Sequence, residues 1–347
     1  MGSVKDLEVL VPPEGDVTGT GRFRFSDRYS VFDWGEMPDL IPDKGASIAL
    51  LSAYFFEKLE DSGMKTHYLG LVEDGGAKPL AELKGPSTTM EIRLLRVLKP
   101  EFADGAYDYS CYEGEKGNFL IPLEIIYRNS LPEGSSVFRR LSSGEVRPED
   151  FGLDRMPVPG EELEEPILDV STKLEVTDRY ISWEEARRIA GLSEAEIEDI
   201  KGVALTVNRM ITDEFSRIGL KNEDGKIELG FDPERRLMLV DVLGTLDECR
   251  FTYRGIPVSK EIARIYYRNT AWYGAVEEAK AADRMRWKEL VREAPEPLPP
   301  RLRTLISQVY ASCTNEITGR EWFREIPPVE EILGEVKEFL SGRTAVA

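Results

Sequence analysis

The stretch Ser26-Asp-Arg-Tyr-Ser-Val-Phe-Asp33 is the part of this chain that decides its fold. It follows a segment, Arg22 to Phe25, in which charged and aromatic residues alternate as in a half-buried strand. Downstream, apolar residues recur at helical spacing from Ala46 to Leu59, and Gly63 follows as the expected helix stop. We therefore expect a strand, a loop and a helix here, with Phe32 in the core.

Short strands are expected to continue through the first half of the chain. Strand-like runs lie at residues 67–72, 90–98 and 119–127, and an earlier one lies at 7–11. The polar, glycine-containing stretch 101–117 predicts an inserted loop or hairpin between the last two runs.

The second half is expected to be largely helical. Capping-box patterns that begin at Ser182 and Ser193 predict a short helix and then a long one that ends near Ile218. A single helix is expected over residues 259–291, before a proline-rich segment, and two further helices over the remainder.

A predicted hairpin carries chemistry that can be argued from the residues alone. Strand-like runs at 226–231 and 237–243 flank the turn Asp232-Pro-Glu-Arg235. If the turn is centred between its last two residues, Glu228 lies directly opposite Asp241. Like charges that face each other across two strands are destabilising. A divalent cation between these carboxylates would reverse the sign of that interaction.

Lys226 belongs to the same predicted arrangement. Side chains on a strand alternate faces, so Lys226 shares a face with Glu228 and could hold a phosphate near the cation. The alternative is a solvated strand edge whose carboxylates never meet. A register shift of one residue would remove the opposition of Glu228 and Asp241.

Composition narrows the functional classes. With 347 residues, of which 41% are hydrophobic, the chain can bury a large core in two or more packed units. A net charge of -19 opposes non-specific binding to nucleic acid or anionic membrane. No run approaches the roughly 18 apolar residues of a membrane span, and the N-terminus lacks a secretory signal pattern. We expect a cytoplasmic protein with small-molecule ligands; homo-oligomerisation stays open.

Histidine and cysteine usage excludes several kinds of site. The three cysteines, Cys111, Cys249 and Cys313, are far apart, which argues against a disulfide framework or a cysteine-rich zinc site. His67 is the single histidine, so multi-histidine metal sites are excluded. The common phosphate-loop, dinucleotide and zinc-protease motifs are absent from the sequence. An enzyme with these residues would use Lys, Arg, Asp, Glu and a hard cation, for which Mg²⁺ with ATP is the obvious candidate.

The sequence resembles the SAICAR synthase family, the phosphoribosylaminoimidazole-succinocarboxamide synthases of purine biosynthesis. The similar phrases occur in the family's order over residues 1 to about 275. They are Gly2-Ser-Val-Lys-Asp-Leu7, the stretch 26–33, Ile41-Pro-Asp-Lys-Gly45, Ser52-Ala-Tyr-Phe-Phe-Glu-Lys-Leu59, Ile121-Pro-Leu-Glu-Ile-Ile-Tyr-Arg128 with Gly134-Ser135, Ser171-Thr-Lys-Leu-Glu175, the hairpin, Thr245-Leu-Asp-Glu-Cys-Arg-Phe251 and Ser259-Lys-Glu-Ile-Ala-Arg264.

The resemblance implies an α+β fold in which a small antiparallel-sheet domain covers the nucleotide and packs on a larger α/β domain. We expect the small domain over residues 1–98, the larger substrate and metal domain over 99–280, and a helical C-terminal extension over 281–347. The implied reaction uses ATP to join carboxyaminoimidazole ribotide to L-aspartate through an acyl phosphate, with Mg²⁺ as the metal.

The resemblance also implies roles for particular residues. The nucleotide would be bound by Gly2, Val4, Lys5, Lys173, Glu228 and Asp241, of which Glu228 and Asp241 would hold the metal. The substrates would be bound by Arg28, Ser30, Arg128, Ser135, Arg250 and Arg264, because arginine forks suit bidentate anions. Catalytic roles would fall to Lys226, Asp247 and Arg250.

Several motif positions depart from the family pattern. Ser3 stands where the family has a phosphate-facing lysine, and Val242 replaces the glutamate after the metal-site aspartate. Glu248 and Cys249 replace a serine pair, and Thr177-Asp-Arg-Tyr180 replaces Gly-Asp-His-Asp. Two alternatives therefore stay open: a ligase on the same scaffold with another carboxylate or amine, marked by Arg179 and Glu248, and a non-catalytic nucleotide-binding relative.

Overall fold

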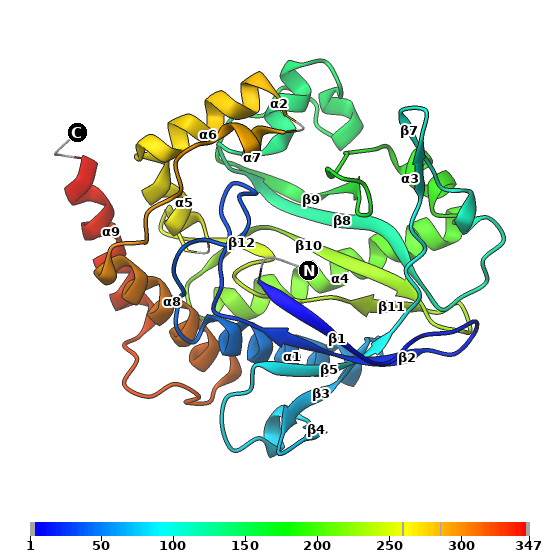
Figure 1. The fold of residues 1–347 in the computed structure, drawn as a ribbon, viewed down its shortest axis with the longest axis horizontal. Coiled ribbons are helices and arrows are strands. Elements are labelled where there is room, and N and C mark those ends of the chain that lie inside the picture. The colour runs from blue at the N-terminus through cyan, green and yellow to red at the C-terminus, as the bar shows by residue number, and fades with distance from the viewer. Residues whose placement is uncertain (1–3, 259, 285, 345–347) are drawn as a thin grey trace.

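The computed structural model describes residues 4–258, 260–284 and 286–344, which form an α+β architecture with two main antiparallel sheets (Figure 1). The N-terminal sheet has the strand order β1-β2-β5-β3-β4. Its strands are β1 (Lys5–Val11), β2 (Gly19–Phe25), β3 (Tyr68–Glu73), β4 (Gly76–Lys78) and β5 (Thr89–Leu94). Helix α1 (Lys44–Asp61) packs against β2, β3 and β5, so the strand, loop and helix expected around the stretch 26–33 are present.

The stretch 26–33 ties three parts of the chain together. The amide and hydroxyl of Ser26 both donate to the carbonyl of Val4, at 3.1 and 2.8 Å. The Asp27 carboxylate accepts from the amide of Gly45 in the first turn of α1 at 3.0 Å. The buried hydroxyl of Tyr29 lies 2.9 Å from that of Tyr267. This stretch therefore fixes β1, α1 and a C-terminal helix relative to one another.

The larger sheet has the order β13-β12-β10-β8-β9, and β11 pairs with β10 beside β8. Its strands are β8 (Phe119–Leu131), β9 (Glu161–Thr172), β10 (Lys221–Phe231), β11 (Leu237–Val240), β12 (Cys249–Tyr253) and β13 (Ile256–Pro257). Helix α4 (Glu194–Ser216) covers one face, where Asn129 of β8 donates to Asn208 of α4 at 2.9 Å. Side chains alternate along a strand, so the neighbouring positions of β8 and β10 point to the opposite face, which carries the charged residues described below.

The expected stretch 101–117 forms a separate hairpin, β6 (Glu101–Ala103) and β7 (Ala106–Asp108). Its two-residue turn, Asp104-Gly105, has positive φ angles of 52° and 83°, which the twist of a tight hairpin requires. In Figure 1 the hairpin stands beside α3 (Trp183–Ile189) at the upper right. Short 3₁₀ segments complete this half of the chain: η1 (Leu80–Glu82), η2 (Ser110–Tyr112) and η3 (Pro148–Phe151).

The expectation of one helix over 259–291 is wrong. The structure has α5 (Glu261–Arg268), α6 (Ala271–Ala282) and α7 (Trp287–Leu290) in its place. The break falls at Thr270, whose side chain caps α6 by accepting from the amide of Tyr273 at 3.3 Å. A side chain that bonds the backbone in this way begins a new helix instead of continuing the old one. The remaining helices are α2 (Ser136–Ser142), α8 (Pro300–Thr318) and α9 (Val329–Thr344).

The two sheets and the C-terminal helices share one apolar core. It contains residues of β2, α1, β8, β10 and α8, and α8 packs directly against α1 and α9 (Figure 1). The three-part division of the chain stays a prediction. No helix within the described ranges is both long enough and apolar enough to cross a membrane.

Candidate active site

The charged face of the larger sheet follows from strand periodicity. Asp224, Lys226 and Glu228 lie at alternate positions of β10 and therefore point to one face. Arg128 and Glu124 of β8 lie directly opposite Asp224 and Glu228 in the ladder, so they share that face. The middle of this sheet thus carries a row of charged side chains, most of them nearly buried.

The hairpin register differs from the prediction by one residue. Glu228 pairs with Val240, and the turn is a five-residue loop centred on Glu234. The cause is Asp232, whose carboxylate accepts from the amides of Glu234 and Arg236 at 3.0 and 2.8 Å and holds the longer loop. The expected direct opposition of Glu228 and Asp241 is therefore wrong.

Asp241 nevertheless reaches Glu228 by another route. It follows the last residue of β11 and has a φ of +68°, a left-handed conformation that changes the direction of its side chain. The charge of Asp241 acts on Glu228, whose pKa is raised by burial first and by this neighbour second. The two carboxylates thus lie close together although they are not a cross-strand pair.

Lysines compensate this pair of carboxylates. The Lys5 ammonium lies 2.6 Å from Asp241, and the Lys173 ammonium contacts Glu228. Burial alone would raise the pKa of Asp241, but the charges of Lys5 and Lys173 outweigh burial and lower it. Of the predicted nucleotide-binding residues, Lys5, Lys173, Glu228 and Asp241 are therefore in one cluster.

A cleft of about 150 Å³ adjoins this cluster. Its walls come from both sheets: Leu7 of β1, Leu95 after β5, Leu120 of β8 and Val240 of β11. One end of the cleft is charged, because Lys173, Glu228 and Asp241 also line it. The arrangement provides an apolar slot for a flat ring next to groups that suit phosphates and a cation.

Two carboxylates are enough for a magnesium site of the kind found in nucleotide enzymes. Mg²⁺ is usually bound by one or two carboxylates, with waters and substrate phosphates as the other ligands. Among the described residues there is no group of three or more His, Cys, Asp and Glu side chains with metal-binding geometry. Glu228, which is buried, and Asp241, which is partly buried, both line the cleft and fit this mode.

Lys226 lies between two acidic side chains. Its ammonium is 2.8 Å from Glu124 and 3.5 Å from Glu248. Burial lowers the pKa of Lys226, but the charges of Glu248, Glu124 and Glu228 more than offset this and raise it overall. The departure at Glu248 therefore provides an ion-pair partner for Lys226, which stays protonated.

A second group of charged residues lies at the other end of β10. Arg250 of β12 forms an ion pair with Asp224, its Nε at 2.7 Å, and Arg128 lies 3.5 Å from the same carboxylate. Arg128 and Arg140 share Asp169 at 3.3 and 2.6 Å. Arg140 is not among the predicted site residues. It lies twelve residues beyond Arg128 in the chain, but helix α2 places it back beside the sheet.

Two buried donors near this group have no partner among the described residues: the Nε atoms of Arg128 and Arg264. The Nε of Arg140 lies 3.5 Å from Glu145. Buried guanidinium nitrogens without partners are costly, and an anionic ligand would satisfy them. Arg264, on α5, has one contact to Glu261 at 3.2 Å. Its buried donor suits the predicted anion pocket.

The serine next to the arginines is not the predicted one. Ser135 is the N-cap of α2 and accepts from the amide of Val137. The Ser136 hydroxyl lies 3.3 Å from Arg128 and faces the arginine group. The spacing between Arg128 and the glycine-serine phrase differs slightly from that of the family, and this difference is the signal that could have shifted the assignment by one residue.

Asp247 has both carboxylate oxygens engaged within the protein. One accepts from the nearly inaccessible Lys44 at 2.6 Å and the other from the hydroxyl of Tyr310 on α8. Its backbone carbonyl accepts from Lys260 at 2.8 Å. The charges of Lys44 and Lys260 overcome the effect of burial and lower the pKa of Asp247. Tyr310 and Lys260 are not among the predicted site residues, because only the packing of their helices brings them close to Asp247.

The remaining predicted residues lie at the N-terminal edge or outside the described structure. Arg28 forms an ion pair with Asp6 at 2.7 Å and donates to Ser26, beside the Val4 carbonyl. Ser30 is half-buried in the loop before α1. Gly2, together with the departure at Ser3, lies outside the described residues. Among the described residues, no hydrogen bond or ion pair joins this edge group to the arginines.

Comparisons with known proteins agree on one family. The family model for SAICAR synthetase matches residues 15–278. A relative from Archaeoglobus fulgidus, provisionally named a phosphoribosylaminoimidazole-succinocarboxamide synthase, is 52% identical over 98% of this chain and 100% of its own length. A phosphoribosylaminoimidazole-succinocarboxamide synthase from Thermoplasma acidophilum is 33% identical over 92% of this chain and 98% of its own length.

Solved structures show the same fold. A SAICAR synthase from Saccharomyces cerevisiae in complex with SAICAR has a TM-score of 0.62 and 22% identity, and covers 93% of this chain and 94% of its own. A SAICAR synthetase in complex with ADP has a TM-score of 0.55 and 24% identity, and covers 86% of this chain and 99% of its own. The predicted α+β fold is confirmed. The chain belongs to the SAICAR synthetase family.

Proposed function

We propose that this chain uses Mg-ATP to join carboxyaminoimidazole ribotide to L-aspartate, forming the succinocarboxamide of de novo purine biosynthesis. The observation that carries the proposal is strand β10, which presents Glu228, Lys226 and Asp224 in a row. Its Glu228 end meets the apolar cleft and the lysines, and its Asp224 end meets the arginines. One strand thus connects a site suited to a nucleotide with a site suited to an anion. Membership of the family supports the same reaction.

The cleft is the proposed ATP site. Leu7, Leu120 and Val240 would contact the purine ring, and Lys5 and Lys173 would bind phosphate oxygens. Mg²⁺, when bound to Glu228 and Asp241, would neutralise charge on the phosphates during phosphoryl transfer. A relative's complex with ADP supports a nucleotide in this fold.

The arginine group is the proposed site for the ribotide. Arg128, Arg250 and Arg264 have the planar donors that bind phosphate or carboxylate in pairs. Arg128 and Arg264 also hold buried nitrogen atoms that an anion would satisfy. Ser136 adds a hydroxyl on the same side as Arg128.

Lys226 is assigned to charge stabilisation and not to proton abstraction. Its raised pKa keeps it cationic near neutral pH. It lies between the two ends of β10, so it can stabilise negative charge on the carboxylate as the acyl phosphate forms and breaks down. Such fixed charges act by positioning and electrostatics. Asp247, with both oxygens engaged, is assigned to holding in place the segment that leads into β12 and Arg250.

The decisive experiment is an assay with purified protein, Mg-ATP, the carboxylated ribotide and L-aspartate, in which ADP and the succinocarboxamide are followed together. We expect both products at equal rates, and neither when the ribotide or L-aspartate is omitted. ADP release that requires a different amine or acid would identify another ligase. Nucleotide binding without turnover of any tested substrate would overturn the proposal and identify a non-catalytic relative.

A further inference from the structure

The loop at residues 173–180, between β9 and α3, borders the proposed active site. It begins with Lys173, whose ammonium contacts Glu228. It also carries Asp178, whose pKa burial raises, and which feels the charges of Glu124, Lys226 and Lys173. The position of this loop therefore sets the position of two charged groups next to β10.

The outer side of the loop is held by the hairpin β6–β7. The hydroxyl of Tyr107, on β7, accepts from the amide of Val176 at 2.9 Å. The hydroxyl of Tyr109, just beyond β7, donates to the carboxylate of Glu175 at 2.9 Å. Both tyrosines come from a hairpin that pairs with neither main sheet. The hairpin is thus attached to the loop through two hydroxyl groups.

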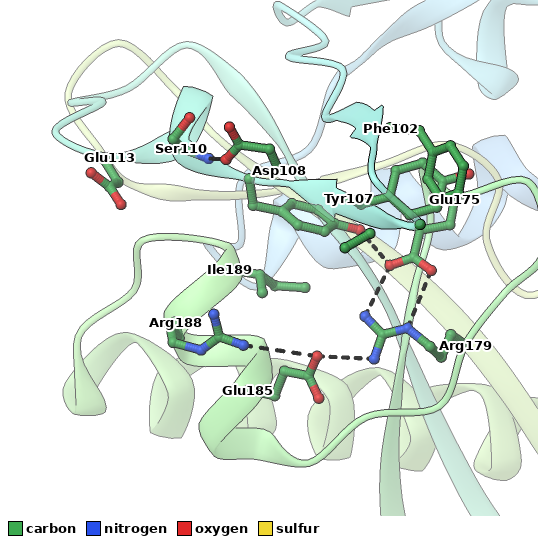
Figure 2. Close-up of a pocket in the computed structure, with 13 residues that line it drawn as sticks. Phe102, Tyr107, Asp108, Ser110, Glu113, Glu175, Arg179, Glu185, Arg188 and Ile189 are labelled. Carbon is green, nitrogen blue, oxygen red and sulfur yellow. Dashed lines mark hydrogen bonds and ion pairs between the residues drawn. The ribbon is translucent and has the colours of Figure 1, made fainter.

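Arg179 links the two ends of the loop to α3. Its guanidinium donates to both carboxylate oxygens of Glu175, at 3.2 and 3.0 Å, and to Glu185 of α3 at 2.9 Å (Figure 2). Its amide donates to Thr172 at the end of β9 at 3.1 Å. The side chain of Glu175 is only 7% exposed, so these contacts are partly shielded from water. Arg179, one of the positions that depart from the family pattern, therefore joins the loop to α3 on the side away from Glu228.

A cavity of about 610 Å³ lies between the hairpin, the loop and α3 (Figure 2). Close packing normally locates a segment in a protein interior. Here the outer side of the loop faces open space, so polar contacts locate that side: the two tyrosine hydroxyls and the guanidinium of Arg179. Backbone hydrogen bonds hold the two ends of the loop, from the amide of Lys173 to Pro122 and from the amide of Thr172 to Arg179.

We propose that Tyr107, Tyr109 and Arg179 are positioning residues that hold the loop 173–180 so that Lys173 and Asp178 lie correctly beside the nucleotide. The inference rests on the proposed function of the cleft as the ATP site. None of the three residues has to touch a substrate. They act through Glu175 and Val176, which link them to the charged end of the loop.

Two variants test this inference. Arg179→Gln removes the ion pairs, and the double variant Tyr107→Phe, Tyr109→Phe removes two hydroxyls while it keeps both rings. We expect each to raise the KM for ATP and lower kcat, together on the order of 10- to 100-fold, the range expected when reacting groups are misplaced by about 1 Å. The KM for the ribotide should change less, because Arg128 is held by Asp169 and Asp224 as well as by Tyr180 at the end of the loop.

Arg188→Gln is the matched control. Arg188 lines the same cavity, is 73% exposed and lies 4.0 Å from Glu185, but within the described part of the chain it forms no hydrogen bond or ion pair with the loop. We expect wild-type kinetics from this variant. If Arg179→Gln does not fold, the double tyrosine variant decides, because its aromatic packing is retained.

Binding of Mg-ADP, measured by calorimetry, separates this inference from the proposed reaction. Should the protein make no succinocarboxamide, weaker Mg-ADP binding in the two variants, with normal binding by Arg188→Gln, would still support the positioning role. Wild-type ADP affinity and wild-type kinetics in both folded variants would overturn it, as would a fall in melting temperature alone.

Discussion

Glu228 and Asp241 are two carboxylates that folding brings together at a cost. Glu228 is nearly buried and Asp241 is partly buried, with 19% of its side chain exposed, and their mutual repulsion adds to the free energy of removing them from water. Lys5 and Lys173 offset part of this cost in the ligand-free protein. A divalent cation bound between the two carboxylates would offset their repulsion more strongly than the lysines do. This is the physical argument that the pair is a metal site.

At the residue scale, Asp241→Asn should abolish the magnesium-dependent step. The amide is a poor ligand for a hard cation, and it leaves Lys5 without its partner. We expect kcat/KM for ATP to fall on the order of 100-fold or more, with the far-ultraviolet circular dichroism unchanged. Asp199→Asn, the same change at an exposed position on α4, is the control. Unchanged kinetics in Asp241→Asn would rule out the metal site.

His67 should make the protein less stable in mild acid. The ring is buried against Phe23 and Phe56, and burial lowers its pKa from 6.5 to about 4. Below pH 6.5 the unfolded chain binds a proton that the folded chain does not, so unfolding becomes easier as pH falls toward 4. The contribution reaches roughly 3 kcal/mol.

Denaturant unfolding of wild type and His67→Asn at several pH values measures this effect. The substitution itself costs packing at every pH. The difference in unfolding free energy between the two proteins should therefore shrink steadily from pH 6.5 to pH 4. A constant difference would show that His67 titrates normally in the folded protein.

At the scale of elements, the sequence predicts local secondary structure, but it misses contacts between residues that are far apart in the chain. The expected hairpin is present, but its register depends on how Asp232 bonds two amides of the loop. The expected carboxylate cluster is also present, but through the left-handed backbone at Asp241. A strand pattern contains neither fact.

Strand β9 shows a second limit. Its first half, Glu161 to Pro166, is acidic and ends in a proline, a composition that is unfavourable for a strand. The structure places β9 at the edge of the sheet, where a proline and exposed charge are tolerated. Arg140 was missed for a related reason, since only the return of α2 toward the sheet brings it to Asp169.

Gly225 in β10 tests how tightly the charged strand is packed. A Cβ there would lie 2.2 Å from the hydroxyl of Tyr127 and 2.9 Å from the sulfur of Cys249, both buried. Gly225→Ala should destabilise the protein by about 1–3 kcal/mol, as overpacking does. Gly202→Ala, in open space on α4, should instead stabilise it by about 1 kcal/mol. Urea unfolding compares the two, and equal effects would contradict the packing argument.

Helix α8 should influence the site through a single hydroxyl. Tyr310→Phe keeps the ring and removes the hydrogen bond to Asp247. We expect the free energy of unfolding to fall by roughly 1.5–3 kcal/mol, which is typical of a hydrogen bond to a charged group. We also expect a lower kcat, because Asp247, in the segment that leads into β12 and Arg250, loses a hydrogen bond. Tyr112→Phe, whose buried hydroxyl bonds the Leu98 carbonyl, is the control for stability without an effect on turnover. Wild-type kcat in Tyr310→Phe would separate α8 from the chemistry.

On the scale of the whole molecule, the negative net charge and the cationic site are compatible. The chain has 64 acidic and 45 basic residues, and acidic side chains also outnumber basic ones among the buried charges of the described residues. Arg128 and Arg140, at 2% and 3% exposed, nevertheless lie together at the charged face of the larger sheet. A local group of arginines within an acidic protein suits small anionic substrates and disfavours long polyanions.

The shared core predicts that the C-terminal helices cannot be removed. Helix α8 buries Leu302, Leu305, Ile306, Val309 and Ile317 against α1 and α9. Exposing five aliphatic side chains costs roughly 8–15 kcal/mol, as much as the whole stability of a typical protein, about 5–15 kcal/mol. A chain that ends after Leu298 should therefore fail to give a cooperative unfolding transition. The single substitution Leu305→Ala should lower the free energy of unfolding by about 2–5 kcal/mol. Leu290→Ala should lower it far less, because Leu290 is 47% exposed. Calorimetry measures all three, and a truncated chain that melts cooperatively and turns over substrate would show that residues 299–347 are separable from the rest of the protein.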